Sequence, residues 1–162
     1  MKILLSNDDG YNSEGLSVLE NSLKNFGSVI VSAPKNNVSA CSSSLSVHSD
    51  VGIKKTDNNH YIIDGTPADC VHIATRGILK KMPDIVFCGI NFGSNLGEDV
   101  IYSGTVGAAI EGRFCKYAPV AISVTSTRFL PGKCICYFNS MSELLETCNL
   151  ICLIVQEIYL LT

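Results

Sequence analysis

Two adjacent carboxylates, Asp8 and Asp9, follow the first apolar run of the chain, residues 2–5. If that run is a strand of an open α/β sheet, the pair lies at the carboxyl edge, where such sheets bind ligands. Carboxylates at close range repel each other, and a cation between them allows both to ionise. Hard ions such as Mg²⁺ and Mn²⁺ prefer these oxygen ligands. The pair therefore indicates a divalent metal site, although the string Asn-Asp-Asp-Gly also suits a simple turn.

A second polar segment, residues 89–97, follows the apolar run 84–88 and carries Asn91 and Asn95 between three glycines. Glycine lets the backbone approach a ligand closely, while an asparagine amide offers an oxygen to a cation or an N–H to a phosphate. The repeated pattern Gly-x-Asn-x-Gly-x-Asn-x-Gly is more than a turn requires. We therefore expect both amides at a binding site, with an ordinary turn as the alternative.

A third segment, residues 102–112, places Ser103 and Thr105 at the expected start of a helix. The free N–H groups of a helix N-terminus bind anions, and the two hydroxyl groups add donors. The alternative is an ordinary Ser/Thr cap on a helix that packs through small residues. The Gly-Lys-Ser/Thr ending of a Walker loop is absent, and no Gly-x-Gly-x-x-Gly fingerprint follows the first strand.

The elements that position these segments alternate between strands and helices, which is the pattern of parallel βαβ units. The predicted strands span residues 2–5, 28–32, 84–88 and 120–124. Between the first two strands, the apolar face of a helix is formed by Leu16, Leu19, Leu23 and Phe26. Either Asn12 or Ser13 caps this helix.

A second helix is predicted to begin at Thr66, because threonine suits the cap, Pro67 the first position and Asp69 the positive end of the helix dipole. Residues 35–60 are rich in Ser, Asn and Asp and indicate a functional loop followed by a hairpin or short strands. Right-handed crossovers bring the carboxyl ends of successive strands to one edge of a sheet. The polar segments are therefore expected to converge on one rim.

The composition, with 46% hydrophobic and 17% charged residues, describes one globular domain over residues 1–162. A net charge of −3 gives no basic surface for duplex nucleic acid or an anionic membrane. The apolar stretch 149–161 is interrupted by polar residues and is too short to span a bilayer. The eight cysteines contain no C-x-x-C pair, so we expect reduced thiols, with Cys134 and Cys136 as a candidate soft-metal pair. No cleavable leader is evident, and we expect a cytoplasmic protein.

In order and spacing, five motifs resemble the survival protein E (SurE) family of metal-dependent nucleotide phosphatases. They are residues 3–10 (Ile-Leu-Leu-Ser-Asn-Asp-Asp-Gly), 33–34 with Asn37 and Ser39, 65–71 (Gly-Thr-Pro-Ala-Asp-Cys-Val), 83–86 with 89–91, and 102–106 with 111–112. The resemblance covers about residues 1–124. It implies a Rossmann-like three-layer α/β sandwich with a mostly parallel sheet.

The resemblance also implies one divalent metal ion, Mg²⁺, Mn²⁺ or similar, with the ligands Asp8, Asp9, Ser39 and Asn91. Phosphate would be bound by Asn95 and by the turn of Ser103, Gly104 and Thr105. The implied activity is that of a 5′-nucleotidase or acid-phosphatase-like hydrolase of phosphoric monoesters. Water would attack nucleoside 5′- and 3′-monophosphates, and Asp8 or Asp9 would be the catalytic carboxylate that accepts its proton.

The chain departs from the family pattern in the loop around Ser39 and in length. Ala40 stands where glycine is common, Ser43 offers a shorter hydrogen-bonding group than the usual His or Asn, and Lys35 and Asn36 replace an acidic and a basic residue. Residues 138–160 resemble the helix after the last matched strand, but family members continue well beyond residue 162. Those later segments carry dimer or tetramer contacts, so homo-oligomerisation is expected for a complete member and stays open for this chain.

Two other functions remain as alternatives. A truncated remnant could bind metal and nucleotide without turnover. A receiver-type signalling domain also carries an acidic pair around Mg²⁺, but it needs a phosphoacceptor aspartate where this chain has Asn91 and a lysine where residues 123–127 have none. The three histidines show no catalytic partner in the sequence, and no Ser-His-Asp arrangement is evident. Direct attack by water is therefore favoured over covalent catalysis.

Overall fold

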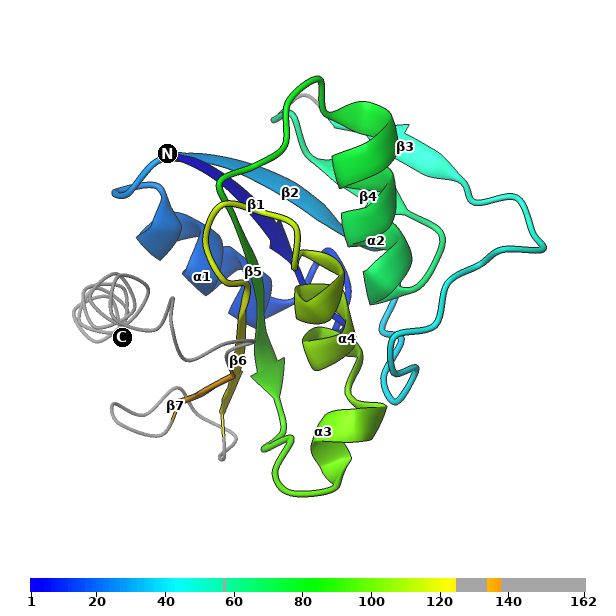
Figure 1. The fold of residues 1–162 in the computed structure, drawn as a ribbon, viewed down its shortest axis with the longest axis vertical. Coiled ribbons are helices and arrows are strands. Elements are labelled where there is room, and N and C mark those ends of the chain that lie inside the picture. Colours follow the sequence, from blue (N-terminus) through cyan, green and yellow to red (C-terminus); the bar gives the residue numbers. More distant parts are fainter. Residues whose placement is uncertain (57, 125–133, 138–162) are drawn as a thin grey trace.

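The computed structural model describes residues 1–56, 58–124 and 134–137, and its centre is a seven-stranded sheet in the order β3-β4-β2-β1-β5-β6-β7 (Figure 1). The five inner strands run parallel, and the edge strands β3 and β7 are antiparallel to their neighbours. The strands are β1 Lys2–Ser6, β2 Ser28–Pro34, β3 Ile53–Lys55, β4 Tyr61–Ile63, β5 Ile85–Phe92, β6 Val120–Val124 and β7 Cys134–Tyr137. The expected α/β architecture with a mostly parallel sheet is confirmed.

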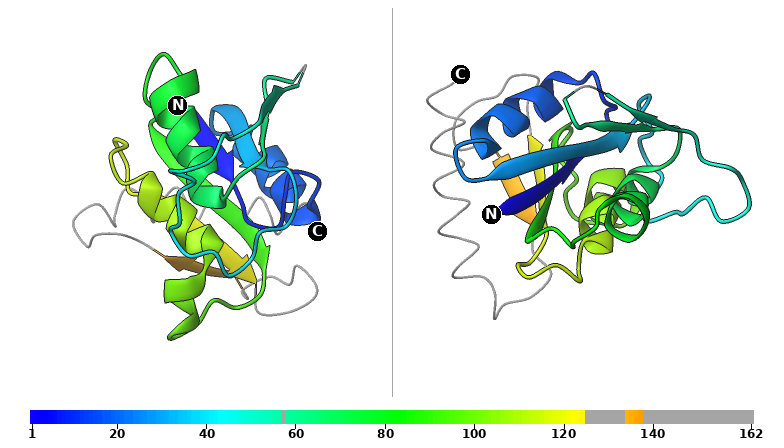
Figure 2. Two further views of the ribbon diagram at one scale, coloured as in Figure 1. Left: turned by 90° about the vertical axis from the view of Figure 1, so that its right-hand side faces the viewer. Right: turned by 90° about the horizontal axis from the view of Figure 1, so that it is seen from above.

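Helices cover both faces of the sheet and complete three layers. They are α1 Glu14–Leu23, α2 Pro67–Ile73, the π-helical turn η1 Ala74–Ile78, α3 Asp99–Tyr102 and α4 Gly104–Glu111. Figure 2 shows α1 on one face of the sheet and α2 with α4 on the other. The side chains of β1 alternate accordingly, because Ile3 and Leu5 belong to the core beneath α1, and Leu4 belongs to the core beneath α2 and α4.

The strand order reverses at β1, which pairs with β2 along one edge and with β5 along the other. Ligands of open α/β sheets bind at the carboxyl ends of strands beside such a reversal. The segment after β1 and the carboxyl end of β5 therefore meet at this position. They carry Asp8, Asp9 and Asn91.

A local cap determines where α1 begins. The Ser13 hydroxyl accepts a hydrogen bond from the Leu16 N–H at 3.4 Å, so Ser13 rather than Asn12 is the cap. The helix ends at Leu23, and Phe26, which was expected on the helix face, contacts the same core from the turn beyond. The prediction was therefore correct for the start of α1 and wrong for its last turn.

Strand β5 continues to Phe92, whereas the sequence predicted a strand over 84–88 and a loop from Gly89 onward. The loop prediction is wrong for its first four residues. Gly89 has a φ of 136°, and a Cβ at this position would lie 2.4 Å from the carbonyl oxygen of Ile122 in β6. Pairing with β6 shifts register here and resumes at Asn91. Glycine thus marks an irregularity within the strand rather than its end.

Helix α1 lies so close to β5 that Gly15 has no room for a side chain, because a Cβ would be 2.1 Å from the carbonyl oxygen of Ile90. We expect Gly15→Ala to lower the free energy of unfolding by about 1–3 kcal/mol, since the methyl group must push the helix off the sheet. Thermal melts should show a midpoint lowered by about 2–10 °C. Gly77→Ala is the matched control, because a Cβ there meets nothing within 4 Å. Equal midpoints for the two variants would contradict the prediction.

Four cysteines fall in the part of the chain whose side chains are described, and all four are free thiols: Cys41, Cys70, Cys88 and Cys115. Burial raises the pKa of Cys70 and Cys88 well above the ordinary value. The helix expected over 138–160 lies outside the described residues. Within the described ranges, no helix is long and apolar enough to cross a membrane.

Candidate functional site

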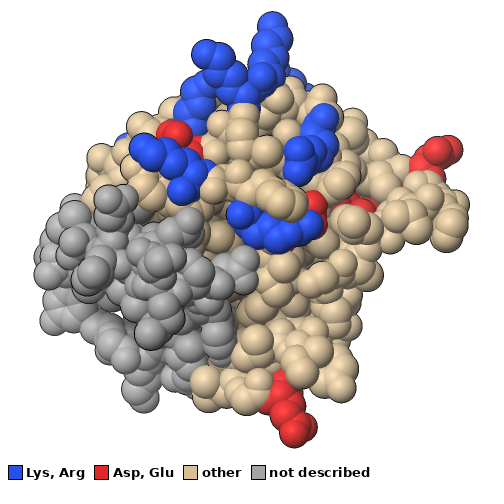
Figure 3. Space-filling view, in the orientation of Figure 1, with Lys and Arg blue, Asp and Glu red and all other residues tan. Residues whose placement is uncertain are grey.

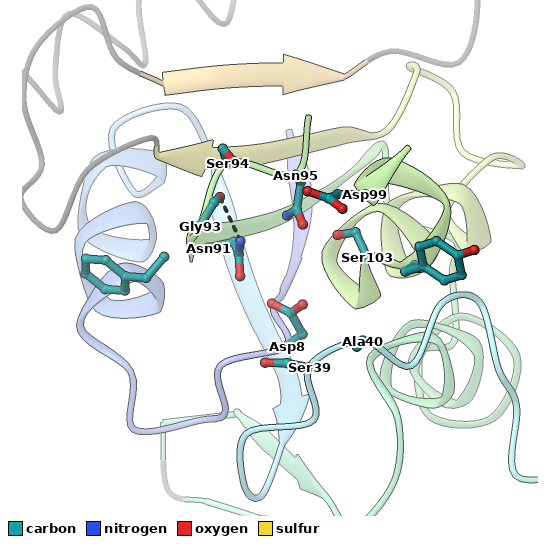
Figure 4. A pocket seen from close by; sticks show the side chains of 11 residues that line it. Asp8, Ser39, Ala40, Asn91, Gly93, Ser94, Asn95, Asp99 and Ser103 are labelled. Carbon is teal, nitrogen blue, oxygen red and sulfur yellow. Dashed lines mark hydrogen bonds between the residues drawn. The ribbon is translucent and has the colours of Figure 1, made fainter. Parts of the chain in front are cut away.

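A cavity of about 310 Å³ opens at the carboxyl edge of the sheet, where β1, β5 and the start of α4 meet the loop after β2 (Figure 4). Its lining residues are Asp8, Ser39, Ala40, Asn91, Phe92, Gly93, Ser94, Asn95, Asp99, Tyr102 and Ser103. All of them except Asp99 come from the polar segments that the sequence singled out. The structure therefore brings those segments together on one rim, as expected.

Asp8 is a deeply buried carboxylate of this cavity and is only 3% exposed. Thr105 holds it in place, because its hydroxyl donates to Asp8 Oδ1 at 2.5 Å and its backbone N–H donates to Oδ2 at 3.2 Å. Burial raises the pKa of Asp8, the bonds from Thr105 oppose that rise, and the charge of Asp9 adds to it. A cation in the cavity would favour the ionised form.

Asp9 is half-buried and is not among the residues that line the cavity. Its Oδ1 accepts a hydrogen bond from Asn37 Nδ2 at 3.2 Å, and its Oδ2 accepts one from the Phe92 N–H at 3.2 Å. Burial raises the pKa of Asp9 as well. The observed contacts of Asp9 thus connect the loop after β2 with the end of β5.

Ser39 lies on the loop after β2 and reaches the cavity from the side opposite β5. Its hydroxyl donates to Asn37 Oδ1 at 2.7 Å, and its N–H donates to the same oxygen at 3.1 Å. Because the hydroxyl proton is used in this way, the oxygen lone pairs of Ser39 can face a cation. The next residue, Ala40, has a φ of 57°, in the left-handed region that glycine adopts most easily.

Asn91 is 7% exposed and belongs to the irregular part of β5. Its Nδ2 donates to the carbonyl oxygen of Gly93 at 3.0 Å. Figure 4 shows that this bond turns the amide oxygen toward the carboxylate of Asp8. The atom that Asn91 offers to the cavity is therefore the oxygen, which is the one a hard cation can bind.

Two of the four residues expected to bind phosphate line the cavity, namely Asn95 and Ser103. Asn95 is held by a bond from its Nδ2 to the hydroxyl of Ser123 at 2.9 Å. Ser103 caps α4, and its hydroxyl accepts from the Val106 N–H at 3.2 Å. An anion at this wall would meet the positive end of the helix dipole.

The other two, Gly104 and Thr105, are not among the lining residues. A Cβ at Gly104 would lie 2.9 Å from the sulfur of Cys41 and 3.0 Å from the Cβ of Asp8, so glycine allows α4 to approach the acidic loop. Thr105 is fully buried, and its hydroxyl and N–H both donate to Asp8. Its direct role toward phosphate stays a prediction, and its observed partner is a carboxylate.

Four of the residues at the site that were not identified from the sequence as binding residues have side chains that could contact a ligand or hold one that does: Asn37, Phe92, Asp99 and Tyr102. Position offers a signal for three of them, because Asn37 lies two residues before Ser39 and the two aromatic residues each adjoin a predicted site residue. Asp99 lies in the four-residue helix α3, which has no apolar stripe by which it could have been predicted.

None of the three histidines lines the cavity. His60, for which the sequence offered no partner, is 8% exposed and lies between Tyr11 OH at 3.1 Å and Glu20 Oε1 at 3.2 Å. His72 Nδ1 lies 2.8 Å from Glu111 Oε1. The geometry thus gives these side chains structural partners rather than contact with the cavity.

The loop that carries Ser39 is anchored to α2 by a buried carboxylate, Asp69. Its oxygens accept hydrogen bonds from the N–H and the hydroxyl of Ser46, at 2.8 and 2.7 Å, and from the Thr66 N–H at 2.8 Å. Thr66 Oγ1 in turn accepts from the Asp69 N–H, which completes a capping box and confirms the predicted start of α2. Burial would raise the pKa of Asp69, but the bonds from Ser46 and Thr66 outweigh it and lower the pKa.

We expect Asp69→Asn to lower the free energy of unfolding by about 1.5–3 kcal/mol at pH 7, the usual worth of hydrogen bonds to a charged group. Because the folded-state pKa is lowered, this stabilisation is present above the ordinary value of about 4 and is lost as pH falls through the folded value. The free energies of unfolding of wild type and Asp69→Asn, measured by denaturant melts, should therefore converge below about pH 4. Asp64→Asn, at an exposed carboxylate, is the control variant. A difference in the free energy of unfolding between wild type and Asp69→Asn that does not change with pH would contradict the prediction.

The donor set around the cavity fits a hard divalent cation. Asp8 offers a buried carboxylate, Asn91 an oriented amide oxygen and Ser39 a hydroxyl oxygen, while Asp9 lies beside them. In the described part of the chain, no three His, Cys, Asp or Glu side chains gather in one group, so a cation here would rely on the neutral oxygens of Ser39 and Asn91 as well as on carboxylates. Mg²⁺ commonly binds one or two carboxylates and keeps several waters, and this set leaves room for them.

The chain is similar to curated proteins named 5′-nucleotidase SurE along most of its described length. The 5′-nucleotidase SurE of Legionella pneumophila (strain Lens) is 52% identical over 124 residues, which are 76% of this chain and 49% of that protein. The 5′-nucleotidase SurE of Ruthia magnifica subsp. Calyptogena magnifica is 54% identical over 126 residues, 78% of this chain and 51% of that protein.

The fold is also similar to that of a solved structure. The crystal structure of the SurE protein from Aquifex aeolicus matches 97% of this chain and 61% of its own, with a TM-score of 0.76 and 40% identity. The chain spans about half the length of the curated relatives it matches. Residues 3–158 match the family described as survival protein SurE. The chain therefore belongs to the survival protein SurE family.

Proposed function

We propose that this chain is a metal-dependent phosphomonoesterase that hydrolyses nucleoside 5′- and 3′-monophosphates. The observation that carries the proposal is one cavity in which cation-binding oxygens face the start of a helix. Asp8, Ser39 and Asn91 supply the oxygens, and Ser103 begins the helix. The names of the relatives, 5′-nucleotidase SurE, support the same reaction.

The metal would be held by Asp8, Asp9, Ser39 and Asn91. When bound, Mg²⁺ or Mn²⁺ would polarise a phosphoryl oxygen and lower the pKa of a bound water. Asp8 faces the cavity and has a pKa raised by burial, so it is our candidate for the group that accepts the proton of the attacking water. Asp9 keeps the loop after β2 and the end of β5 in place.

The phosphate would lie against Ser103 and Asn95 at the start of α4. Among the described residues that line the cavity there is no Lys or Arg, so within this part of the chain the positive charge that a phosphate needs would come from the metal and the helix dipole. Figure 3 shows the same separation on the surface, where Lys and Arg gather on the part of this face away from α3. In the described part of the site, the substrate would therefore be recognised by a small number of neutral donors together with the cation.

Release of inorganic phosphate from AMP and 3′-AMP tests the proposal. We expect hydrolysis with Mn²⁺ or Mg²⁺ and none when the metal is removed by EDTA, with recovery on adding metal back. Hydrolysis that persists in EDTA would contradict the metal assignment. Mn²⁺ and AMP binding without any phosphate release would contradict the enzymatic proposal and favour a binding protein.

A further inference from the structure

Two aromatic side chains line the cavity although most of its other lining is polar or small. Phe92 is the last residue of β5, and Tyr102 is the last residue of α3. Their exposed fractions are 40% and 61%. Aromatic surface of this kind is usually buried in a core, and exposed rings beside a polar cavity are typical of ligand contacts.

The exposure of the lining changes from the floor of the cavity to its rim. Three of the polar residues that would bind metal and phosphate are nearly inaccessible, at 3% for Asp8, 7% for Asn91 and 5% for Ser103, whereas Ser39 is exposed. The two aromatic residues are the large apolar side chains of the exposed part of the lining, which also includes Ser39, Ala40, Gly93 and Asp99. A ligand with one ionic end and one flat apolar end would match both zones.

The volume of the cavity favours the same arrangement. At about 310 Å³ it lies at the lower end of the range of about 300–1,000 Å³ that small-molecule pockets occupy. A metal ion, a phosphate group and a sugar fill much of such a space. The remaining part of a nucleotide, its base, must therefore lie toward the rim.

Both aromatic residues are fixed relative to the floor through their backbones. The Phe92 N–H donates to Asp9 Oδ2 at 3.2 Å, and the Tyr102 carbonyl oxygen accepts from the Ser42 N–H at 3.0 Å. Phe92 adjoins Gly93, and Tyr102 adjoins the cap of α4. In Figure 4, Gly93 and that cap lie on opposite sides of the Asp8 side chain. The rings are thus attached to two different walls.

We propose that Phe92 and Tyr102 bind the nucleobase of the substrate through contact with the faces or edges of their rings. This inference rests on the proposed function and adds to it the two residues that would favour a nucleotide over a sugar phosphate without a base. Ile101 is 71% exposed but does not line the cavity, so the two rings are distinct from the general apolar surface of α3.

The test compares AMP with ribose 5-phosphate, which keeps the sugar and phosphate and lacks the base. Removing a ring that stacks on a base lowers binding by roughly 5- to 140-fold. We therefore expect the ratio of kcat/KM for AMP to that for ribose 5-phosphate to fall by such a factor in Tyr102→Ala and in Phe92→Ala. Tyr102→Phe keeps the ring and should keep the ratio.

Phe114→Ala is the matched control. Phe114 is 59% exposed, lies beyond the far end of α4 and does not line the cavity, so the ratio should stay at the wild-type value. A wild-type ratio in both Tyr102→Ala and Phe92→Ala would overturn the inference and leave the proposed function intact. If neither ester is hydrolysed by the wild-type chain, the proposed function fails, and calorimetry with adenosine decides the inference. Equal adenosine affinity in wild type and both alanine variants would then overturn it, and weaker binding in the variants would support it.

Discussion

Replacement of Asp8 by asparagine is expected to lower metal-dependent phosphate release by more than about a hundredfold. Loss of a residue that only supports a metal ligand typically costs about 10- to 100-fold in activity. Asp8→Asn removes the charge of a proposed direct ligand while keeping its shape, and Asp8 is the buried carboxylate among the residues that line the cavity. The measurement is the initial rate of phosphate release from AMP at saturating Mn²⁺.

Thermal melts in EDTA and in Mn²⁺ give a second result that does not depend on turnover. Burial raises the pKa of Asp8, so in the metal-free chain its contribution to stability is present at low pH and is lost as pH rises through the folded value. At pH 7, Asp8→Asn should therefore melt no lower than wild type in EDTA, while losing the rise in midpoint that Mn²⁺ produces.

The control for Asp8→Asn is Asp84→Asn. Asp84 precedes β5 at the opposite edge of the sheet, where its Oδ2 accepts a hydrogen bond from the Lys2 N–H at 2.7 Å. This variant should keep both the rate and the response to Mn²⁺. A wild-type rate in Asp8→Asn, or an undiminished Mn²⁺ shift, would remove Asp8 from the metal site.

Thr105→Val is expected to lower the rate by about 10- to 100-fold, which is the usual effect of losing a partner that orients a metal ligand. Valine keeps the volume of threonine but cannot donate to Asp8 Oδ1. The backbone N–H of residue 105 still donates to Oδ2, so the helix keeps its approach to the acidic loop. Titration with Mn²⁺ should show weaker metal binding together with the slower rate.

Two further variants separate this role from simple packing. Thr105→Ser restores a hydroxyl and should recover most of the rate and the metal affinity. Thr75→Val makes the same substitution in η1, where the hydroxyl donates to the carbonyl oxygen of Val71 within the helix, and should keep the wild-type rate. Wild-type Mn²⁺ affinity in Thr105→Val would show that this hydroxyl does not position Asp8.

Local features of the chain could be predicted from the sequence because local chemistry decides them. Strand β6 has the predicted bounds, residues 120–124, since its apolar, β-rich composition marks the strand although its partners β5 and β7 lie elsewhere in the chain. Thr66 was predicted as a cap, and Ser13 was one of two candidates with Asn12, because a hydroxyl at such a position bonds a backbone group three residues later. Helix α3, with four residues and no buried side chain, offered no such pattern.

The orientation of the site residues could not be predicted in the same way. Adjacent residues point in different directions, so the sequence could not tell that Asp8 lines the cavity while Asp9 bonds Asn37 and the Phe92 N–H. The partner of Thr105 is 97 residues away, and nothing in a helix-start motif indicates a distant carboxylate. The sequence thus identified the segments, and tertiary contacts decide which atom each one presents.

The distances along the chain between bonded site residues determine when the cavity can exist during folding. Asp9 bonds Phe92 across 83 residues, and Asp8 bonds Thr105 across 97. Such contacts close large loops, and they require β5 to have paired beside β1 and α4 to have packed on the sheet. A divalent ion would therefore find its ligands only in the assembled domain and not in the unfolded chain. Adding metal after folding should slow unfolding, whereas metal present at the start of refolding should leave the early steps unchanged.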